Sequence, residues 1–425
     1  MDLKSNQEYT NYIETVCSQI KGREVKDEVT LELKHHIQDI AAEYLEEGMT
    51  ESEAVAKAIS RMGSAEVVGK ELNKVHKPRP DWGIVTLTFV LVIAGLFIAY
   101  CLDLDTSVQG YPDLFSTKVA FSVLGIALAA GLYFFDYRKI QPYSLYLYFA
   151  AVLALFFIPL LFNYSGFARV VAEISLLLLV ISLAGMFQHW KWEQPKYYIL
   201  GLGVFSLPLC LLFVRSSLAV ALSLSVVLLI LMYLSRAKAW QIILTAGLAG
   251  PGTLLMIGIS APYQINRLLA LLNPGLDSTG YGWLALQAET LRNSAGIFGQ
   301  GINSDTLLLP NLQGEFVLNY IIYTFGWLAA IVLIISVAVF IFRLVGIGLK
   351  VKNSYGKFLT TGIATILGFR FLWNILMNLG ILPIAGLNFP LISSGGLDFL
   401  INMVMIGLIL SIYRRRTLTS RIESI

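Results

Sequence analysis

Three charged residues stand inside otherwise apolar stretches of this sequence, namely Glu173, Arg370 and Asp398. An ionised side chain surrounded by hydrocarbon is energetically unfavourable, so residues of this kind are functional-site candidates by default. Arg370 and Asp398 are predicted to pair across neighbouring helices. The simpler alternatives are a purely structural ion pair, or a side chain that extends to the membrane surface.

A second candidate site is the polar interval from Pro262 to Phe316, which is 55 residues long. Connections of this length are usually functional or disordered. Its Leu and aromatic residues favour an ordered loop with a function. Glu315 lies directly before the next apolar stretch. It is either a functional carboxylate or an ordinary acidic residue at a helix start, where the helix dipole favours negative charge.

The elements that position these residues are predicted to be transmembrane helices. Of the 425 residues, 56% are hydrophobic and 14% are charged, and the mean hydropathy is +0.69. This composition is typical of a polytopic membrane protein and predicts an all-α fold. About ten apolar segments are long enough, at about 17–25 residues, to cross about 30 Å of hydrocarbon. They lie near residues 84–102, 118–135, 143–162, 169–187, 197–213, 217–234, 240–258, 317–342, 359–379 and 397–413.

Lys and Arg follow the second, fourth, sixth, eighth and tenth apolar segments, while the alternate connections contain few of them. Because cytoplasmic connections are enriched in these residues, both termini are predicted to be cytoplasmic. The loop at about residues 260–316 is then predicted to face outward. An outward site has no supply of ATP or nucleotide sugars, and no Walker or Rossmann fingerprint is present. A reaction there needs a substrate that is already energised and is delivered within the lipid.

Residues 1–80 are predicted to form a separate, small helical domain. Sixteen of the 28 acidic residues precede the first apolar segment, which favours a soluble, cytoplasmic unit. Thr50 and Glu53 have capping-box spacing after a helix that ends at Gly48. The run Gly-Met-Thr-x-x-Glu-Ala-Val from Gly48 resembles the permease-prefix or HAAS-type domain, whose implied role is interaction or regulation; a role in folding or stability is the alternative. The Lys-Pro-Arg-Pro run ending at Pro80 predicts a stiff linker.

Short motifs recur in a fixed order in and after the long loop. They are Arg267-Leu-Leu-Ala-Leu-Leu-Asn-Pro274, Gly299-Gln-Gly301, Leu309-Pro310 followed by Glu315-Phe316, Asn378-Leu-Gly-Ile-Leu-Pro383, and Pro390-Leu-Ile-Ser-Ser-Gly-Gly396. In order and spacing this set resembles the SEDS family (shape, elongation, division and sporulation), which includes RodA, FtsW and SpoVE. The family's ten membrane segments, with a large outer loop between the seventh and eighth, also fit. The resemblance covers about residues 84–416.

The resemblance implies a peptidoglycan glycosyltransferase that polymerises lipid II on the outer face of the bacterial cytoplasmic membrane, usually beside a class B penicillin-binding transpeptidase. Lipid II carries its own leaving group, a polyprenyl diphosphate. The reaction needs a carboxylate as general base, and the matching residue is Glu315. Cations assist the departing diphosphate, a role assigned to Arg267 and Arg370. No nucleic acid partner and no cofactor are expected, with an assisting divalent metal ion as an open alternative.

The motif before the last apolar segment is implied to contact substrate through Ser393, Ser394, Gly395 and Gly396. The simpler interpretation of the glycine pair is a helix-entry turn that needs no side chain. For Arg267 the alternative to diphosphate binding is a contact with a lipid headgroup.

The sequence departs from the family pattern at charged and polar positions. The family's catalytic position is an aspartate, whereas Glu315 is one methylene longer. Ser394 replaces a tyrosine, Asp398 replaces a small residue, and Leu176 stands where a lysine follows Glu173. Three functions therefore remain: a glycosyltransferase, a non-catalytic paralogue that binds or regulates partners, and a transporter of a lipid-linked precursor whose polar path the intramembrane charges would line.

Overall fold

The computed structural model describes most of the chain, and all secondary structure in the described residues is helical. The described residues are 6–20, 23–76, 80–105, 113–161, 165–214, 218–248, 269, 271, 280–302 and 309–416. The chain divides into two compact units, of which the first comprises Met1–Arg79 and Arg415–Ile425 and the second Pro80–Arg414. The division falls at the linker proposed from the sequence.

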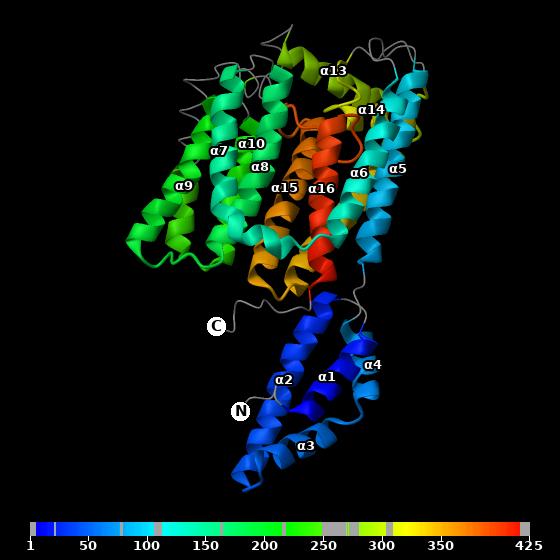
Figure 1. Ribbon diagram of the computed structural model, residues 1–425. Helices are drawn as coiled ribbons and strands as arrows, with labels where there is room; N and C mark the ends of the chain where they lie inside the picture. Colours follow the sequence, from blue (N-terminus) through cyan, green and yellow to red (C-terminus); the bar gives the residue numbers. More distant parts are fainter. Residues whose placement is uncertain are drawn as a thin grey trace. The chain divides into compact units, whose positions relative to one another are not determined.

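The N-terminal unit is a bundle of helices (Figure 1). They are α1 (Gln7–Gln19), α2 (Arg23–Glu46), α3 (Glu51–Met62) and α4 (Ala65–His76). Val16, Ile37 and Val55 from the first three helices are buried in its core. The predicted capping box is confirmed, because the Thr50 side chain faces the backbone N–H of Glu53 and the Glu53 carboxylate accepts the backbone N–H of Thr50 at 3.2 Å. The Thr50 hydroxyl also donates to Glu53 Oε2 at 2.6 Å. These bonds hold the pKa of Glu53 below its usual value.

The second unit is a bundle of apolar helices (Figure 1). Its elements are α5 (Trp82–Leu104), α6 (Leu114–Phe134), η2 (Tyr137–Tyr143), α7 (Ser144–Leu161), α8 (Ser165–Phe187), α9 (Pro195–Val214), α10 (Leu218–Leu234), α13 (Tyr281–Ser294), α14 (Val317–Lys350), α15 (Ser354–Asn378) and α16 (Gly396–Arg414). Eight of the described helices are long and apolar enough to cross a membrane, and Ala219–Leu234 and Ala239–Leu248 are shorter apolar helices. Each of the ten predicted apolar segments therefore coincides with a helix. The part of the seventh segment after Leu248 lies outside the described residues.

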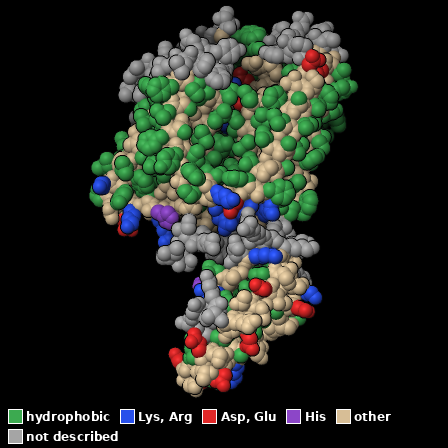
Figure 2. All heavy atoms as spheres, viewed as in Figure 1, with side chains coloured by type: hydrophobic (Ala, Val, Ile, Leu, Met, Phe, Trp, Pro, Cys, Tyr) green, Lys and Arg blue, Asp and Glu red, His purple; other side chains and the backbone are tan. Residues whose placement is uncertain are grey.

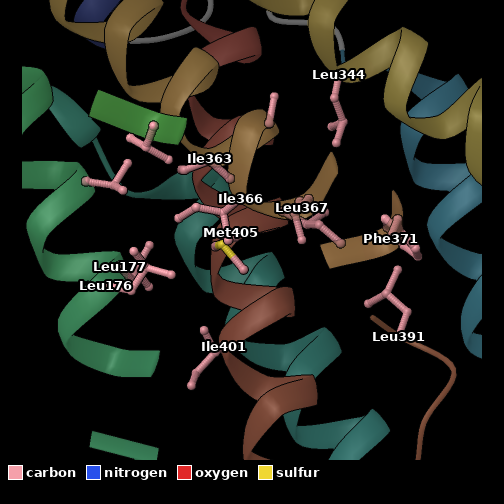
Figure 3. Close-up of a cluster of buried hydrophobic side chains, with 14 of the residues drawn as sticks. Leu176, Leu177, Leu344, Ile363, Ile366, Leu367, Phe371, Leu391, Ile401 and Met405 are labelled. Carbon is pink, nitrogen blue, oxygen red and sulfur yellow. The ribbon is translucent and has the colours of Figure 1, made fainter. Parts of the chain in front are cut away.

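Helices α8, α15 and α16 pack together in the core of the second unit (Figure 3). Leu176 and Leu177 of α8 lie close to Ile363 and Leu367 of α15 and to Met405 of α16, and all five are buried. Helices α5, α6 and α7 instead expose large apolar side chains, which cover much of the surface in Figure 2. Such a surface suits contact with lipid, and the helices satisfy their backbone hydrogen bonds internally.

The two ends of the second unit carry different elements (Figures 1 and 2). Element η2, which contains Arg138 and Lys139, lies at the lower end in Figure 1, together with the α8–α9 connection that contains Lys191. Figure 2 shows Lys and Arg side chains at that end. Helix α13 of the long loop lies at the opposite end. The positive residues used to predict orientation are thus remote from the described part of the loop.

Helix α14 bends sharply at Gly326, where φ is +86° and ψ is 172°. The loop segment 296–301 pairs with the backbone at this bend; for example, Gln300 N–H donates to Tyr323 O at 2.8 Å. The two backbones approach so closely that a Cβ on Gly326 would overlap the carbonyl of Ile297. The bend therefore attaches the long loop to the start of a membrane helix.

Replacing Gly326 with Ala is expected to lower the free energy of unfolding by about 1–3 kcal/mol, because L residues avoid this backbone conformation and the new Cβ has no space. Gly299, with φ +84°, faces the same contact from the loop, so Gly299→Ala should give a similar loss. Gly346→Ala is the matched control, since a Cβ there meets no neighbouring atom within 4 Å. Thermal unfolding in detergent measures the difference, and equal stability of the Gly326 and Gly346 variants would contradict the interpretation.

Candidate functional site: a charged cavity beside a fixed carboxylate

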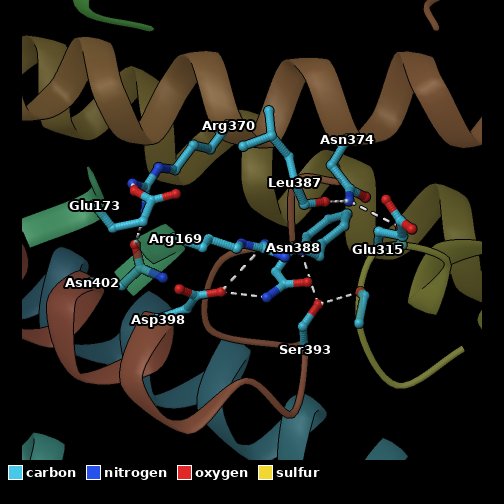
Figure 4. Close-up of polar contacts among 12 residues, drawn as sticks. Arg169, Glu173, Glu315, Arg370, Asn374, Leu387, Asn388, Ser393, Asp398 and Asn402 are labelled. Carbon is cyan, nitrogen blue, oxygen red and sulfur yellow. Dashed lines mark hydrogen bonds and ion pairs between the residues drawn. The ribbon is translucent and has the colours of Figure 1, made fainter. Parts of the chain in front are cut away.

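Polar side chains from three helices meet between α8, α15 and α16 (Figure 4). Each helix contributes two polar residues four positions apart, and this spacing places both on one face of the helix. The pairs are Arg169 and Glu173 on α8, Arg370 and Asn374 on α15, and Asp398 and Asn402 on α16. Asn374 is on the side of Glu315, and its amide bonds to backbone carbonyls there rather than to the charged residues. The sequence-predicted residues Glu173, Arg370 and Asp398 are thus brought into one cluster.

Glu173 and Arg370 form the buried part of this cluster. Their side chains are 4% and 5% exposed, and they form an ion pair through Glu173 Oε2 and Arg370 Nη2. Arg370 Nη1 also donates to Asn402 Oδ1 at 3.4 Å. A buried charge needs a partner, because an apolar environment cannot solvate it. The pair therefore explains how both charges are tolerated within apolar helices.

Asp398 and Arg169 form the more exposed part of the cluster. Arg169 Nη2 lies 3.6 Å from Asp398 Oδ2, and the two side chains are 42% and 17% exposed, respectively. Asn388 Nδ2 donates to the same carboxylate oxygen. The predicted Arg370–Asp398 pair is therefore not the one that forms. Arg370 contacts Asn402, which lies one helical turn further along α16 than Asp398.

These side chains line a small cavity that is open to the surface. Residues of the segment 387–395 and Phe399 complete its wall. Figure 2 shows acidic and basic atoms inside a recess surrounded by hydrophobic side chains. Two arginines and two carboxylates face this cavity, so their formal charges cancel. An anionic ligand would have to compete with Asp398 for Arg169, the more exposed of the two cations.

Glu315 lies on the other side of the segment that carries Leu387, away from the charged cluster (Figure 4). Its backbone carbonyl accepts hydrogen bonds from Asn374 Nδ2 at 3.0 Å and from Asn378 Nδ2 at 2.9 Å. Asn374 Nδ2 also donates to Leu387 O at 2.6 Å. One carboxylate oxygen of Glu315 is buried, and a Cβ on Gly386 would lie 3.7 Å from it. The backbone of Glu315 is thus held firmly, but its side chain is not among the described residues that line the cavity.

Ser393 and Ser394 connect the turn before α16 to the residues before α14. Ser393 Oγ donates to Gly314 O at 2.6 Å and accepts the N–H of Phe389 at 2.8 Å. Ser394 N–H donates to Gln313 O at 2.8 Å. Both serines therefore have structural contacts, and their predicted contact with substrate stays a prediction.

Gly395 and Gly396 form the entry to α16. The carbonyl of Gly395 accepts the N–H of Phe399 at 2.9 Å. A Cβ on Gly396 would overlap the ring of Phe121 on α6, and a Cβ on Gly395 would lie 2.9 Å from Asn388 Nδ2. The structure agrees with the helix-entry interpretation, and it adds that Gly396 leaves space for the ring of Phe121.

Several polar residues of this region were not predicted from the sequence. They are Arg169, Asn374, Asn388 and Asn402, of which three repeat at four-residue spacing with a predicted residue. Arg292 of α13 is a further cation, whose Nη1 donates to Asn378 O at 2.7 Å. Burial lowers the pKa of Arg292, and the nearby carboxylate of Glu289 opposes that shift.

The predicted diphosphate ligand Arg267 lies outside the described residues. Within the described parts of the chain, no group of three or more His, Cys, Asp or Glu side chains is placed to bind a metal ion.

Sequence comparison matches residues 81–418 to a family model described as cell cycle protein and named for FtsW, RodA and SpoVE. A probable peptidoglycan glycosyltransferase FtsW of Geobacter sulfurreducens is 25% identical over 366 residues, which cover 81% of this chain and 98% of the relative. The protein with the same name in Coxiella burnetii is 28% identical over 359 residues, which cover 78% of this chain and 95% of the relative.

Comparison with solved structures gives similar coverage. A chain of the structure described as "Structural coordination of polymerization and crosslinking by a peptidoglycan synthase complex" has a TM-score of 0.64 at 22% identity, covering 80% of this chain and 99% of that chain. The rod shape determining protein RodA of Thermus thermophilus has a TM-score of 0.56 at 19% identity, covering 79% and 97%. At these identities, the similarity shows a shared fold.

Proposed function

The chain belongs to the FtsW, RodA and SpoVE family of cell cycle proteins, and from this membership we propose that it is a peptidoglycan glycosyltransferase. It is an integral protein of the bacterial cytoplasmic membrane. Its substrate in this proposal is lipid II, a sugar precursor joined to a polyprenyl chain through a diphosphate. Relatives named as probable peptidoglycan glycosyltransferases match about four-fifths of the chain, which supports this activity.

The observation that carries the proposal is the fixed position of Glu315. Two asparagine side chains of α15 hold its peptide carbonyl, and the N-terminus of α14 begins two residues later. A general base must be held within hydrogen-bond reach of the proton that it accepts, and a fixed backbone meets this requirement for position. Glu315 is accordingly assigned as the general base.

The reaction transfers a glycosyl group between two precursors. A sugar hydroxyl of one precursor forms a bond from its oxygen to the anomeric carbon of the other, and its proton passes to Glu315. The bond between that carbon and the diphosphate oxygen breaks, and the polyprenyl diphosphate leaves with the electron pair. Arg169 and Arg370 face the neighbouring cavity and are assigned to the leaving diphosphate, because preorganised cations stabilise charge that develops during the reaction. Of the two arginines, Arg169 is more accessible to the diphosphate, because its side chain is more exposed.

The proposal includes an orientation and a partner. The basic connections lie at the end remote from α13, so this end and both termini are assigned to the cytoplasm. Glycan synthesis then occurs on the outer face. A class B penicillin-binding transpeptidase is the proposed partner, in line with the similarity to a chain of a structure described as coordinating polymerization and crosslinking.

A second candidate function is non-catalytic binding of wall-synthesis proteins. The observation that favours it is the separation of Glu315 from the charged cavity by the segment that carries Leu387 (Figure 4). In this case the protein keeps the family fold and a surface that binds partner proteins, but it does not transfer glycosyl groups. Co-purification with a wall-synthesis protein that survives Glu315→Ala, from a preparation without polymerase activity, would support this function.

The test of the proposed function is glycan formation by the purified protein in detergent. Lipid II with a labelled sugar is supplied, and chain length is read by gel electrophoresis. The assay is run alone and with a class B transpeptidase whose crosslinking serine is replaced, so that only polymerisation is measured. Chains longer than two disaccharides are expected in at least one condition. Unreacted lipid II in both conditions would contradict the glycosyltransferase assignment and leave the second candidate.

A further inference from the structure

A buried lysine on α6 binds the turn that precedes α16. Lys118 is 1% exposed, and its Nζ donates to the carbonyl of Leu391 at 2.9 Å and to the carbonyl of Ser393 at 2.6 Å. Nζ also lies 4.4 Å from the centre of the Phe399 ring. An ammonium group has three donors, so two carbonyls and one aromatic face satisfy it completely. A lysine that is buried this deeply is unfavourable without such contacts. The three partners named above all belong to the turn before α16 or to the first turn of α16.

The turn that Lys118 binds has a backbone that needs support. Leu391 has φ of +67°, in the left-handed region that a residue with a Cβ rarely adopts. Its side chain is buried in the core shown in Figure 3, so the residue is held from both its side chain and its carbonyl. Such conformations persist only where the surroundings determine them, and they concentrate near functional sites.

The same turn is connected to the backbone of the proposed base. Ser393, whose carbonyl Lys118 holds, donates from Oγ to Gly314 O, and the next residue, Ser394, donates its N–H to Gln313 O. Gly314 directly precedes Glu315. A continuous series of hydrogen bonds therefore runs from the ammonium group through the turn to the peptide before the carboxylate.

We propose that Lys118 is a positioning residue for glycosyl transfer. Its ammonium group fixes the turn at residues 389–394, and the turn fixes the backbone at Glu315 through Ser393 and Ser394. The inference rests on the proposed function for its catalytic part. Lys118 itself is not among the described residues that line the charged cavity, so it acts through the turn rather than on the substrate.

The first test separates rate from binding. Lys118→Met keeps the apolar length but loses the donors, and kcat for glycan formation is expected to fall about 10- to 100-fold with KM within about threefold, since a small displacement of a catalytic group costs about that much rate. Lys118→Arg keeps a cation with several donors and should recover part of the rate. Ser122→Ala is the matched control, because Ser122 is equally buried one turn further along α6 and makes no described bond to the turn.

The second test reads the positioning itself, independently of activity. Hydrogen–deuterium exchange of the full-length protein in detergent is measured for peptides covering residues 311–316 and 387–396. Faster exchange in both segments is expected for Lys118→Met, with less change for Lys118→Arg and none for Ser122→Ala. If the wild type forms no glycan, the proposed function fails while this exchange result still decides the positioning role.

Two results would overturn the inference. One is exchange in both segments that is unchanged in Lys118→Met. The other is a rise that is equally large in α9, which would show general loss of stability. If Lys118→Met does not fold, Lys118→Gln is measured instead, because its amide can donate to only part of the turn. Unchanged exchange and unchanged kcat in that variant would likewise reject the positioning role.

Discussion

Glu315→Gln is expected to reduce glycan formation by about 10²- to 10⁴-fold, the usual contribution of a positioned general base. An amide has nearly the same shape as the carboxylate but does not accept the proton of the attacking hydroxyl. The variant should fold normally, because Asn374 and Asn378 bind the backbone carbonyl of residue 315 rather than its side chain. The loss should therefore appear in kcat, without a change in the thermal unfolding midpoint.

Two further variants give this experiment its controls. Glu315→Asp shortens the side chain by one methylene and is expected to keep activity, or to raise it, because the resemblance implies an aspartate at this position. Glu289→Gln removes an exposed carboxylate of α13 and should change nothing. Wild-type activity in Glu315→Gln would exclude Glu315 as the base. Activity in Glu315→Asp, with none in the wild type, would identify a protein that has lost glycosyltransferase activity and has another function.

Arg370→Met is expected to lower the free energy of unfolding by about 3–5 kcal/mol, because it leaves Glu173 buried without a cation. The double variant Glu173→Leu/Arg370→Met removes both charges and should recover most of that loss, since a well-packed apolar pair is often as stable as a buried ion pair. The two side chains are almost fully buried. Unfolding by heat or by a denaturing detergent measures the three stabilities.

The control for this prediction is Arg169→Met. Arg169 is part of the exposed pair with Asp398, at 3.6 Å. Exposed pairs contribute about 0–1 kcal/mol, so this variant should remain close to wild type in stability. If Arg370→Met were no less stable than Arg169→Met, the buried pair would not be a structural requirement. Equal losses in the single and double variants would show instead that the polar groups themselves are needed.

Much of the fold was predictable because hydropathy and length are strong local signals. The candidate membrane helices coincide with apolar segments visible in the sequence, whereas α13 lies in the polar loop and was not predicted. The capping box at Thr50 and Glu53 is likewise a local signal. The bend at Gly326 was not predictable. The apolar stretch runs through this glycine without interruption, and the loop segment 296–301 that pairs with it is about thirty residues earlier in the chain.

The sequence predicted some residues of the candidate site, but it did not predict which of them contact one another. Glu173, Arg370 and Asp398 are conspicuous because charges are rare in apolar helices. Helical spacing predicts which face a residue occupies, but not its depth relative to a neighbouring helix, and the choice between Glu173 and Asp398 as the partner of Arg370 depends on depth. Lys118 stands at the start of an apolar segment, where a charge suggests an interface. Its burial depends on a turn more than 270 residues later.

The bend at Gly326 also has a consequence for how the protein is made. Thirty-four residues of straight helix would measure about 51 Å, well beyond the hydrocarbon thickness of about 30 Å. The stretch before the bend is almost entirely covered by protein, and its Asn319 donates to Asn378 in α15. The ribosome synthesises Asn319 well before Asn378. The bond between Asn319 and Asn378 can therefore form only after α15 has been synthesised, whereas the pairing of the bend with loop segment 296–301 involves residues that are made earlier.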